Sequence, residues 1–89
     1  MIPIGKIVKV THNGKLIVKA EAIPKLGAEV HDASTSLVGY VDDIIGPVAS
    51  PYIVVRASGQ GIKQPEHLMN RMLYTVSVTK KLHIKGGRT

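Results

Sequence analysis

Short runs of alternating apolar and polar residues, separated by turn residues, dominate the chain. The alternation is clearest at residues 15–20, where Leu16, Val18 and Ala20 share one face. Because a strand points successive side chains to opposite faces, this run predicts a β-strand with one buried face. The same criteria predict five further strands, at residues 4–10, 29–33, 37–45, 52–57 and 72–78.

Turn residues stand between these runs. Asn13 and Gly14 accept positive φ angles, so the pair predicts a type I′ hairpin turn between the first two strands. Pro65 and Glu66 favour the beginning of one short helical turn at residues 65–71. Six short strands and tight turns predict an all-β fold, a small six-stranded antiparallel barrel, since closure removes unpaired sheet edges.

The chain of 89 residues has room for a single domain. We expect the barrel to occupy residues 1–78 and residues 79–89 to form a basic, weakly ordered C-terminal tail. In the tail Leu82 and Ile84 alternate with polar residues, so it could add a strand to a partner, although fraying is favoured. The sequence has no cysteine, no signal-peptide pattern and no apolar run of roughly 18 residues, so we expect a soluble intracellular protein.

The net charge of +6 is unevenly distributed along the chain. Residues 1–27 carry five lysines against one glutamate, and residues 71–89 carry five basic residues and no acid. Basic ends around an acidic centre suggest residence near nucleic acid, because lysine and arginine displace counterions from phosphates. Ordinary solubility charge explains the same distribution equally well.

Candidate catalytic groups are sparse. Asp42 and Asp43 are adjacent, and neighbours in a strand point to opposite faces, so the two carboxylates are not expected to converge on one substrate atom. The four histidines show no metal-binding spacing, and no serine lies in a nucleophile motif. We therefore predict a protein that is not an enzyme, with no catalytic residue, metal or cofactor.

The segment GYVDDIIGPVASPY at residues 39–52 has a different character. Ile44 and Ile45 are adjacent near the end of a predicted strand, so at most one of them can point into a barrel. Pro47 and Pro51 have no N–H to donate and fix their own φ angles, which predicts a stiff connection that presents Val48 outward. A rigid apolar surface lowers the entropic cost of docking a partner. The alternative is an apolar turn that folds back as a lid over the end of the barrel.

Three segments together resemble one known family, the Gar-one family, which is the small barrel subunit of box H/ACA ribonucleoproteins, here in its archaeal, barrel-only form. They are GKIVKVTHNGKLIVKAE at residues 5–21, VGYVDDIIGPVASPY at 38–52 and PEHLMNRMLYTV at 65–76. The central pattern, G-x-V-D-x-I-x-G-P-V-x-x-P-Y, is long and its Gly-Pro spacing is unusual. Ile45 stands where Phe or Leu is commoner, and Asn70 stands where Gly is usual.

This resemblance implies a barrel of the translation-factor (reductase/elongation-factor) type and a non-catalytic role. Such subunits bind the catalytic domain of a dyskerin-type pseudouridine synthase, while a guide RNA selects the uridine in rRNA, and they influence a mobile loop that holds substrate RNA. Guide RNA and the other H/ACA subunits would be indirect partners, no membrane is implied, and an archaeal member would be cytoplasmic. By position, the partner-facing residues would be Ile44, Ile45, Gly46, Pro47, Val48, Pro51 and Tyr52.

Two other functions stay open at this point. A Naf-type assembly factor has a similar barrel core, but long disordered flanks are expected there and the sequence shows none. A free-standing RNA-binding barrel would account for the net charge.

Overall fold

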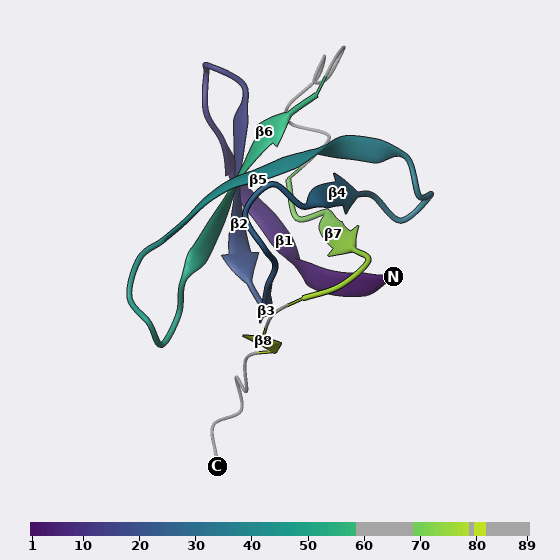
Figure 1. Ribbon diagram of the computed structural model, residues 1–89. Coiled ribbons are helices and arrows are strands. Elements are labelled where there is room, and N and C mark those ends of the chain that lie inside the picture. Colours follow the sequence, from purple (N-terminus) through teal and green to yellow (C-terminus); the bar gives the residue numbers. More distant parts are fainter. Residues whose placement is uncertain (59–68, 79, 82–89) are drawn as a thin grey trace.

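The computed structural model describes residues 1–58, 69–78 and 80–81. Six strands form a closed antiparallel barrel in the order β1-β2-β6-β5-β4-β7, and β3 and β8 form a separate two-stranded sheet (Figure 1). The strands are Ile2–Val10 (β1), Lys15–Ala20 (β2), Ala22–Ile23 (β3), Glu29–His31 (β4), Leu37–Ile45 (β5), Tyr52–Ala57 (β6), Met72–Thr75 (β7) and Lys80–Lys81 (β8).

The predicted six-stranded antiparallel barrel is confirmed. Strands at residues 15–20, 37–45 and 52–57 have the predicted bounds, whereas the last barrel strand ends at Thr75 rather than at residue 78. Most of the predicted helical turn lies outside the described residues. At its end, Asn70 adopts a left-handed φ of 64°, which Asn tolerates better than other residues except Gly.

The interior is filled by apolar side chains that form rows from strand to strand on the inner face of the barrel. One such row comes from four adjacent strands, where Ile7 pairs with Val18, Val18 with Ile53, and Ile53 with Ile44. The first three of these side chains are fully buried, and Ile44 packs against them from a partly buried position. Because the β-branched residues of the sequence supply these rows, the chain builds its core without Phe or Trp.

The turn between β1 and β2 differs from the predicted type I′ turn. Gly14 has a positive φ of 88°, but Asn13 does not, so only one of the two required positive angles is present. The Gly14 N–H donates to the Thr11 carbonyl at 3.0 Å, and the Thr11 N–H donates to the Lys15 carbonyl at 2.8 Å. This is a three-residue loop closed by a glycine, the next commonest hairpin connection. The Thr11 hydroxyl, which accepts the Lys15 N–H at 2.9 Å, stabilises the longer loop.

The barrel closes between β4 and β7, where the ladder consists of one pair, His31 with Tyr74. The Thr75 hydroxyl lies fully buried beside this pair and donates to the Glu29 carbonyl at 2.9 Å. A side-chain hydrogen bond therefore supplements the short ladder that completes the barrel.

A second sheet was not predicted. Ala22 pairs with Lys81 and Ile23 pairs with Lys80, so the chain after the barrel returns to β3 before residues 82–89, which lie outside the described part. The single-domain division at residue 78 and the weakly ordered tail remain predictions.

Two strands approach each other too closely for any side chain at Gly39. A Cβ atom added there would lie 2.1 Å from the Arg56 carbonyl oxygen, which belongs to the neighbouring strand β6. Backbone atoms cannot move away as the end of a side chain can, so this contact requires a residue without a Cβ. Gly27 differs, because its φ is 84° but a Cβ atom there would meet nothing within 4 Å.

We predict that Gly39→Ala destabilises the barrel by about 3 kcal/mol or more, because the added methyl group would force β5 and β6 apart. Gly27→Ala is the control and should cost only about 1 to 2 kcal/mol, the penalty of a left-handed backbone angle. Thermal unfolding followed by circular dichroism measures both variants. Equal shifts of the two midpoints would contradict the close approach of β5 and β6.

Candidate functional site

A β-bulge near the end of β5 controls which side chains this strand exposes. Val41 pairs with Val55 and Asp43 pairs with Val54, so Asp42 is the extra residue between them. A bulge of one residue shifts the alternation of the strand by one position. After the bulge, therefore, the inward and outward faces are exchanged.

This exchange determines the orientation of the two adjacent isoleucines. Val41 is buried, and uninterrupted alternation from it would place Ile45 in the core and Ile44 outside. With the bulge, Ile44 packs against the core, and 43% of the Ile45 surface is exposed. The structure thus answers which isoleucine belongs to the core.

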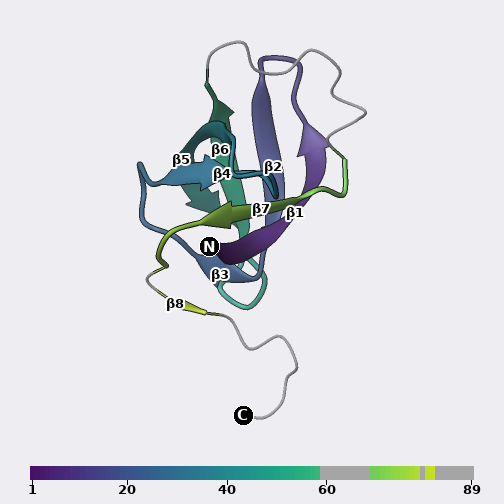
Figure 2. The same ribbon diagram turned by 90° about the vertical axis from the view of Figure 1, so that its right-hand side faces the viewer.

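The connection from β5 to β6 forms a tight turn at the same end of the barrel as β3 (Figure 2). The Ser50 N–H donates to the Pro47 carbonyl at 3.1 Å, which places Val48 and Ala49 at the tip. Val48 is 90% exposed, so the lid alternative, which requires this side chain to cover the barrel, is wrong. Gly46 begins the turn with a φ of 92°, an angle that side chains strongly disfavour.

The end of the turn is held against the barrel. Pro51 is buried, and its carbonyl accepts the Ala20 N–H at 3.1 Å, which links the turn to the end of β2. Tyr52 is half-buried, and its ring lies 3.4 Å from the position that a Cβ atom of Gly46 would occupy. The turn is therefore anchored at its second half and exposed at its tip.

The seven residues that the sequence analysis assigned to partner binding lie together but are not equivalent. Four are exposed, two are half-buried, and Pro51 is buried, so the surface that they offer comes chiefly from the exposed four. The exposed members are Ile45, Gly46, Pro47 and Val48. We name these four residues the docking loop.

Two apolar residues on the outer face of β2 and β6 were not proposed as functional residues from the sequence. Ile17 and Val54 pair with each other on the outer face of the barrel, and neither belongs to the internal core cluster. A signal was available for Ile17, because it is two residues from both Lys15 and Lys19 and therefore shares their outward face.

The adjacent carboxylates both lie on the outside, so the prediction that they point to opposite faces is wrong; the bulge abolishes the alternation on which it depended. Asp42 Oδ2 accepts a hydrogen bond from Lys15 Nζ at 2.8 Å, and this bond lowers the pKa of the Asp42 carboxyl group. Asp43 Oδ1 instead accepts the Ile44 N–H at 2.8 Å. The two carboxylates thus serve separate local contacts.

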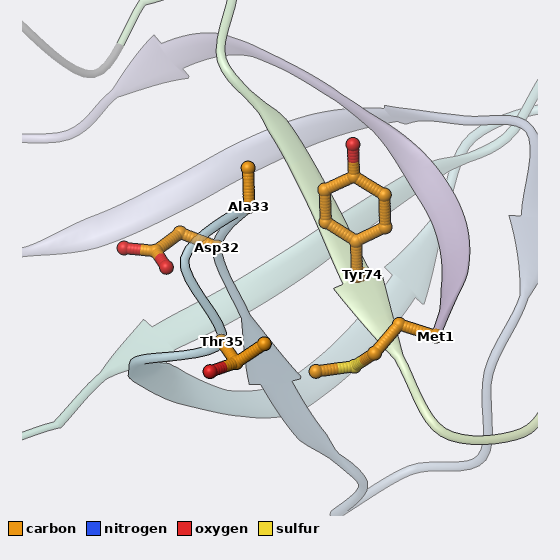
Figure 3. Close-up of a pocket in the computed structure, with 5 residues that line it drawn as sticks. All are labelled: Met1, Asp32, Ala33, Thr35 and Tyr74. Atoms are coloured by element: carbon orange, nitrogen blue, oxygen red, sulfur yellow. The ribbon is translucent and has the colours of Figure 1, made fainter.

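A small pocket (Figure 3) lies at the connection from β4 to β5, and this connection is at the opposite end of β5 from the docking loop. It has a volume of about 210 Å³ and is lined by Met1, Asp32, Ala33, Thr35 and Tyr74. Ligand pockets typically measure roughly 300 to 1,000 Å³. Its carboxylate is engaged locally, because Asp32 Oδ1 accepts the Ser34 and Ser36 N–H groups at 2.9 and 3.0 Å. We therefore place no chemistry in this pocket.

Within residues 1–58, 69–78 and 80–81, no three side chains of His, Asp or Glu gather into a metal site. No helix in this described part is long and apolar enough to span a membrane.

We predict that Ile44→Asp unfolds the barrel, because it would place a carboxylate against Ile53 and the rest of the core. The expected loss is about 3 kcal/mol or more, a large part of the stability of a small domain. Ile45→Asp should change the unfolding midpoint little, since this side chain already contacts water. Circular dichroism melts measure both variants, and a folded Ile44→Asp together with an unfolded Ile45→Asp would reverse our assignment of the bulge.

This chain is similar to known proteins in sequence and in fold. The model of the family described as "Gar1/Naf1 RNA binding region" matches residues 1–85. An uncharacterized protein from Methanothermobacter thermautotrophicus is 35% identical over 88 residues, which cover 99% of this chain and 94% of that protein. Among solved structures, the Gar1 domain of Naf1 superimposes with a TM-score of 0.65 at 18% identity, covering 84% of this chain and 81% of that one. The chain belongs to the Gar1/Naf1 RNA-binding-region family.

Proposed function

We propose that this protein is a non-catalytic subunit of a box H/ACA guide ribonucleoprotein. It binds the catalytic domain of a dyskerin-type pseudouridine synthase through the docking loop and promotes loading and release of substrate RNA during pseudouridylation of rRNA. Of the three remaining residues of the proposed partner-facing segment, Pro51 and Tyr52 hold the turn against the barrel, and Ile44 packs against the core.

One observation carries this proposal, the exposure of Ile45 and Val48 on a rigid turn. Val48 exposes 90% of its surface and Ile45 exposes 43%, although both are apolar. Pro47 fixes its own φ, and the carbonyl of Pro51 is bonded to β2, so little conformational entropy remains to be lost on binding. An apolar, preordered turn of this kind suits the centre of a protein interface.

Family membership supports the ribonucleoprotein context. The matched family is described by its RNA-binding region, and the match extends over residues 1–85. The apolar docking loop, however, is a poor surface for phosphates, because it carries no charged or hydrogen-bonding side chain. We therefore assign the loop to a protein partner within the RNA-containing particle.

A subunit without catalytic groups can accelerate a reaction by favouring one conformation of its partner. The possible gain is limited by the difference in its affinity for the two conformations. A preference of about 1.4 to 2.8 kcal/mol would change the affected step tenfold to a hundredfold. If the favoured conformation sets the substrate loop of the synthase, the affected steps are RNA loading and product release.

A second candidate function is that of a Naf-type assembly factor, which the structural similarity to the Gar1 domain of Naf1 favours. An assembly factor leaves before the mature particle acts, whereas a subunit stays through many turnovers. Retention of the protein in active particles separates the two functions.

Binding to the synthase should depend on Ile45. We predict that Ile45→Asp reduces the binding free energy for an archaeal H/ACA pseudouridine synthase by about 2 to 4 kcal/mol, because a buried, unpaired carboxylate would face apolar surface. The loss of affinity is detected as reduced co-elution. Val76→Asp is the matched control, since Val76 is 70% exposed and follows β7, which is not adjacent to β5 or β6 in the barrel. If both variants bind as well as the wild type, the docking loop is not the interface.

A comparison of multiple-turnover with single-turnover rates distinguishes an effect on RNA loading and release from an effect on the chemical step. We predict that the protein accelerates multiple-turnover modification by about ten to a hundred times, and single-turnover modification with enzyme in excess much less. Ile45→Asp should abolish the difference between the two regimes. Equal acceleration in both regimes would place the effect on the chemical step and contradict the proposed control of RNA loading and release.

A further inference from the structure

The docking loop alone is too small for a stable interface. It offers four residues, whereas a typical specific interface uses roughly 20 to 30 residues on each side. A partner seated on the loop must therefore cover neighbouring surface of the barrel. The surface continuous with the loop is the outer face of β5, β6, β2 and β1, which follow one another in the barrel wall.

Strand register places specific side chains on this face. Ile45 pairs with Tyr52, Tyr52 pairs with Lys19, and Lys19 pairs with Lys6, so these four residues form one row across four strands. Adjacent strands lie about 4.8 Å apart, so Lys19 is about 10 Å from Ile45 along this row. The row thus leads from the apolar docking loop to two lysines.

A parallel row lies further from the loop. It contains the pair Ile17 and Val54, with Lys9 beside Ile17 at one end and Asp43 beside Val54 at the other. Val54 is only 8% exposed although it is on the outer face, so neighbouring side chains cover most of it. The outer face therefore combines an apolar pair, Ile17 and Val54, with lysines on β1 and at the end of β2.

The lysine pair is not neutralised by the described part of the chain. Lys6 and Lys19 are directly opposite each other, an arrangement of like charges that destabilises a ladder, and neither forms an ion pair within that part. Lys15 on the same face differs, because Asp42 pairs with it at 2.8 Å. On β2, therefore, Lys19 is nearer the docking loop and has no acidic partner in the described part of the chain. Lys15 is farther from the loop and is paired with Asp42.

We propose that the docking surface extends from the docking loop across Tyr52 to Lys6 and Lys19, and that the synthase meets these lysines with acidic side chains. This inference rests on the proposed function and specifies the chemistry of the partner surface: apolar opposite Ile45 and Val48, acidic opposite the lysine pair. The isolated barrel tolerates the opposed lysines because water screens them, and the partner's carboxylates neutralise them on docking.

The observations favour a protein over an RNA at this surface. Tyr52 is half-buried beneath the loop, and the apolar pair Ile17 and Val54 lies next to the lysine row. RNA bound without sequence preference needs a cationic groove together with exposed aromatic rings. A mixed apolar and cationic face matches an apolar protein interface with a charged rim.

The test compares two charge reversals of equal size. Lys19→Glu changes the proposed surface, and Lys25→Glu is the control, because Lys25 is exposed in the connection between β3 and β4, outside the lysine row. Association with an archaeal H/ACA synthase is measured by stopped flow at several salt concentrations. Lys19→Glu should slow association about tenfold at low salt and reduce its salt dependence, since rim charges steer encounter. Lys25→Glu should change the rate less than twofold.

The other possible results distinguish a failure of the extended surface from a failure of the proposed function. If Lys19→Glu associates like the wild type while Ile45→Asp fails to bind, the proposed function stands and the extended surface is wrong. If the wild type does not bind the synthase, the proposed function fails and this inference fails with it. If Lys19→Glu weakens binding to guide RNA alone in a filter-binding salt series and leaves synthase association unchanged, the lysines face RNA and the inference is overturned.

Discussion

The insertion of one residue, Asp42, that has no partner in the ladder between β5 and β6 determines both the end of the core and the candidate binding surface of this barrel. Before the bulge, Val41 points inward against Val55. After it, Ile44 completes an internal row with Ile53, and Ile45 is turned outward at the beginning of the docking loop. The same backbone irregularity therefore fills the end of the core and exposes an apolar side chain.

The docking loop depends on this arrangement and on two further constraints. Gly46 supplies the left-handed angle with which the turn begins, and the Pro51 carbonyl is bonded to β2 at its end. Between these two residues, the side chain of Val48 is exposed to solvent. A small barrel can expose an apolar surface in this way without weakening its core, because the exposed residues are separate from those that fill the interior.

The sequence allowed the fold to be predicted in outline and the site only in part. Alternation and turn residues located the six barrel strands, since these signals are local. They did not locate the bulge at Asp42, because two adjacent aspartates are compatible with regular alternation and with an interruption of it. They also did not reveal the pairing of β3 with β8, which joins distant segments through only two residue pairs.

The outer face shows the same limit. The periodicity of β2 placed Ile17 and Lys19 outside, but only the register of β2 with β1 and β6 shows that Lys19 lies between Lys6 and Tyr52. Register depends on neighbouring strands and turns, which the pattern of one segment does not fix. The resemblance to a known family, in contrast, could be recognised from the sequence because the glycine and proline spacing of residues 46–51 is a local feature.

The most direct measurement is the isoleucine methyl spectrum of the labelled protein, recorded before and after addition of unlabelled synthase. We expect the Ile45 signal to shift or broaden on binding, while the signal of Ile2, half-buried and paired with Thr75 on β7, stays in place. Ile45 is informative because the bulge turns it outward, whereas Ile53 is fully buried and reports only on the fold. A spectrum in which Ile2 responds to the synthase and Ile45 does not would contradict the account.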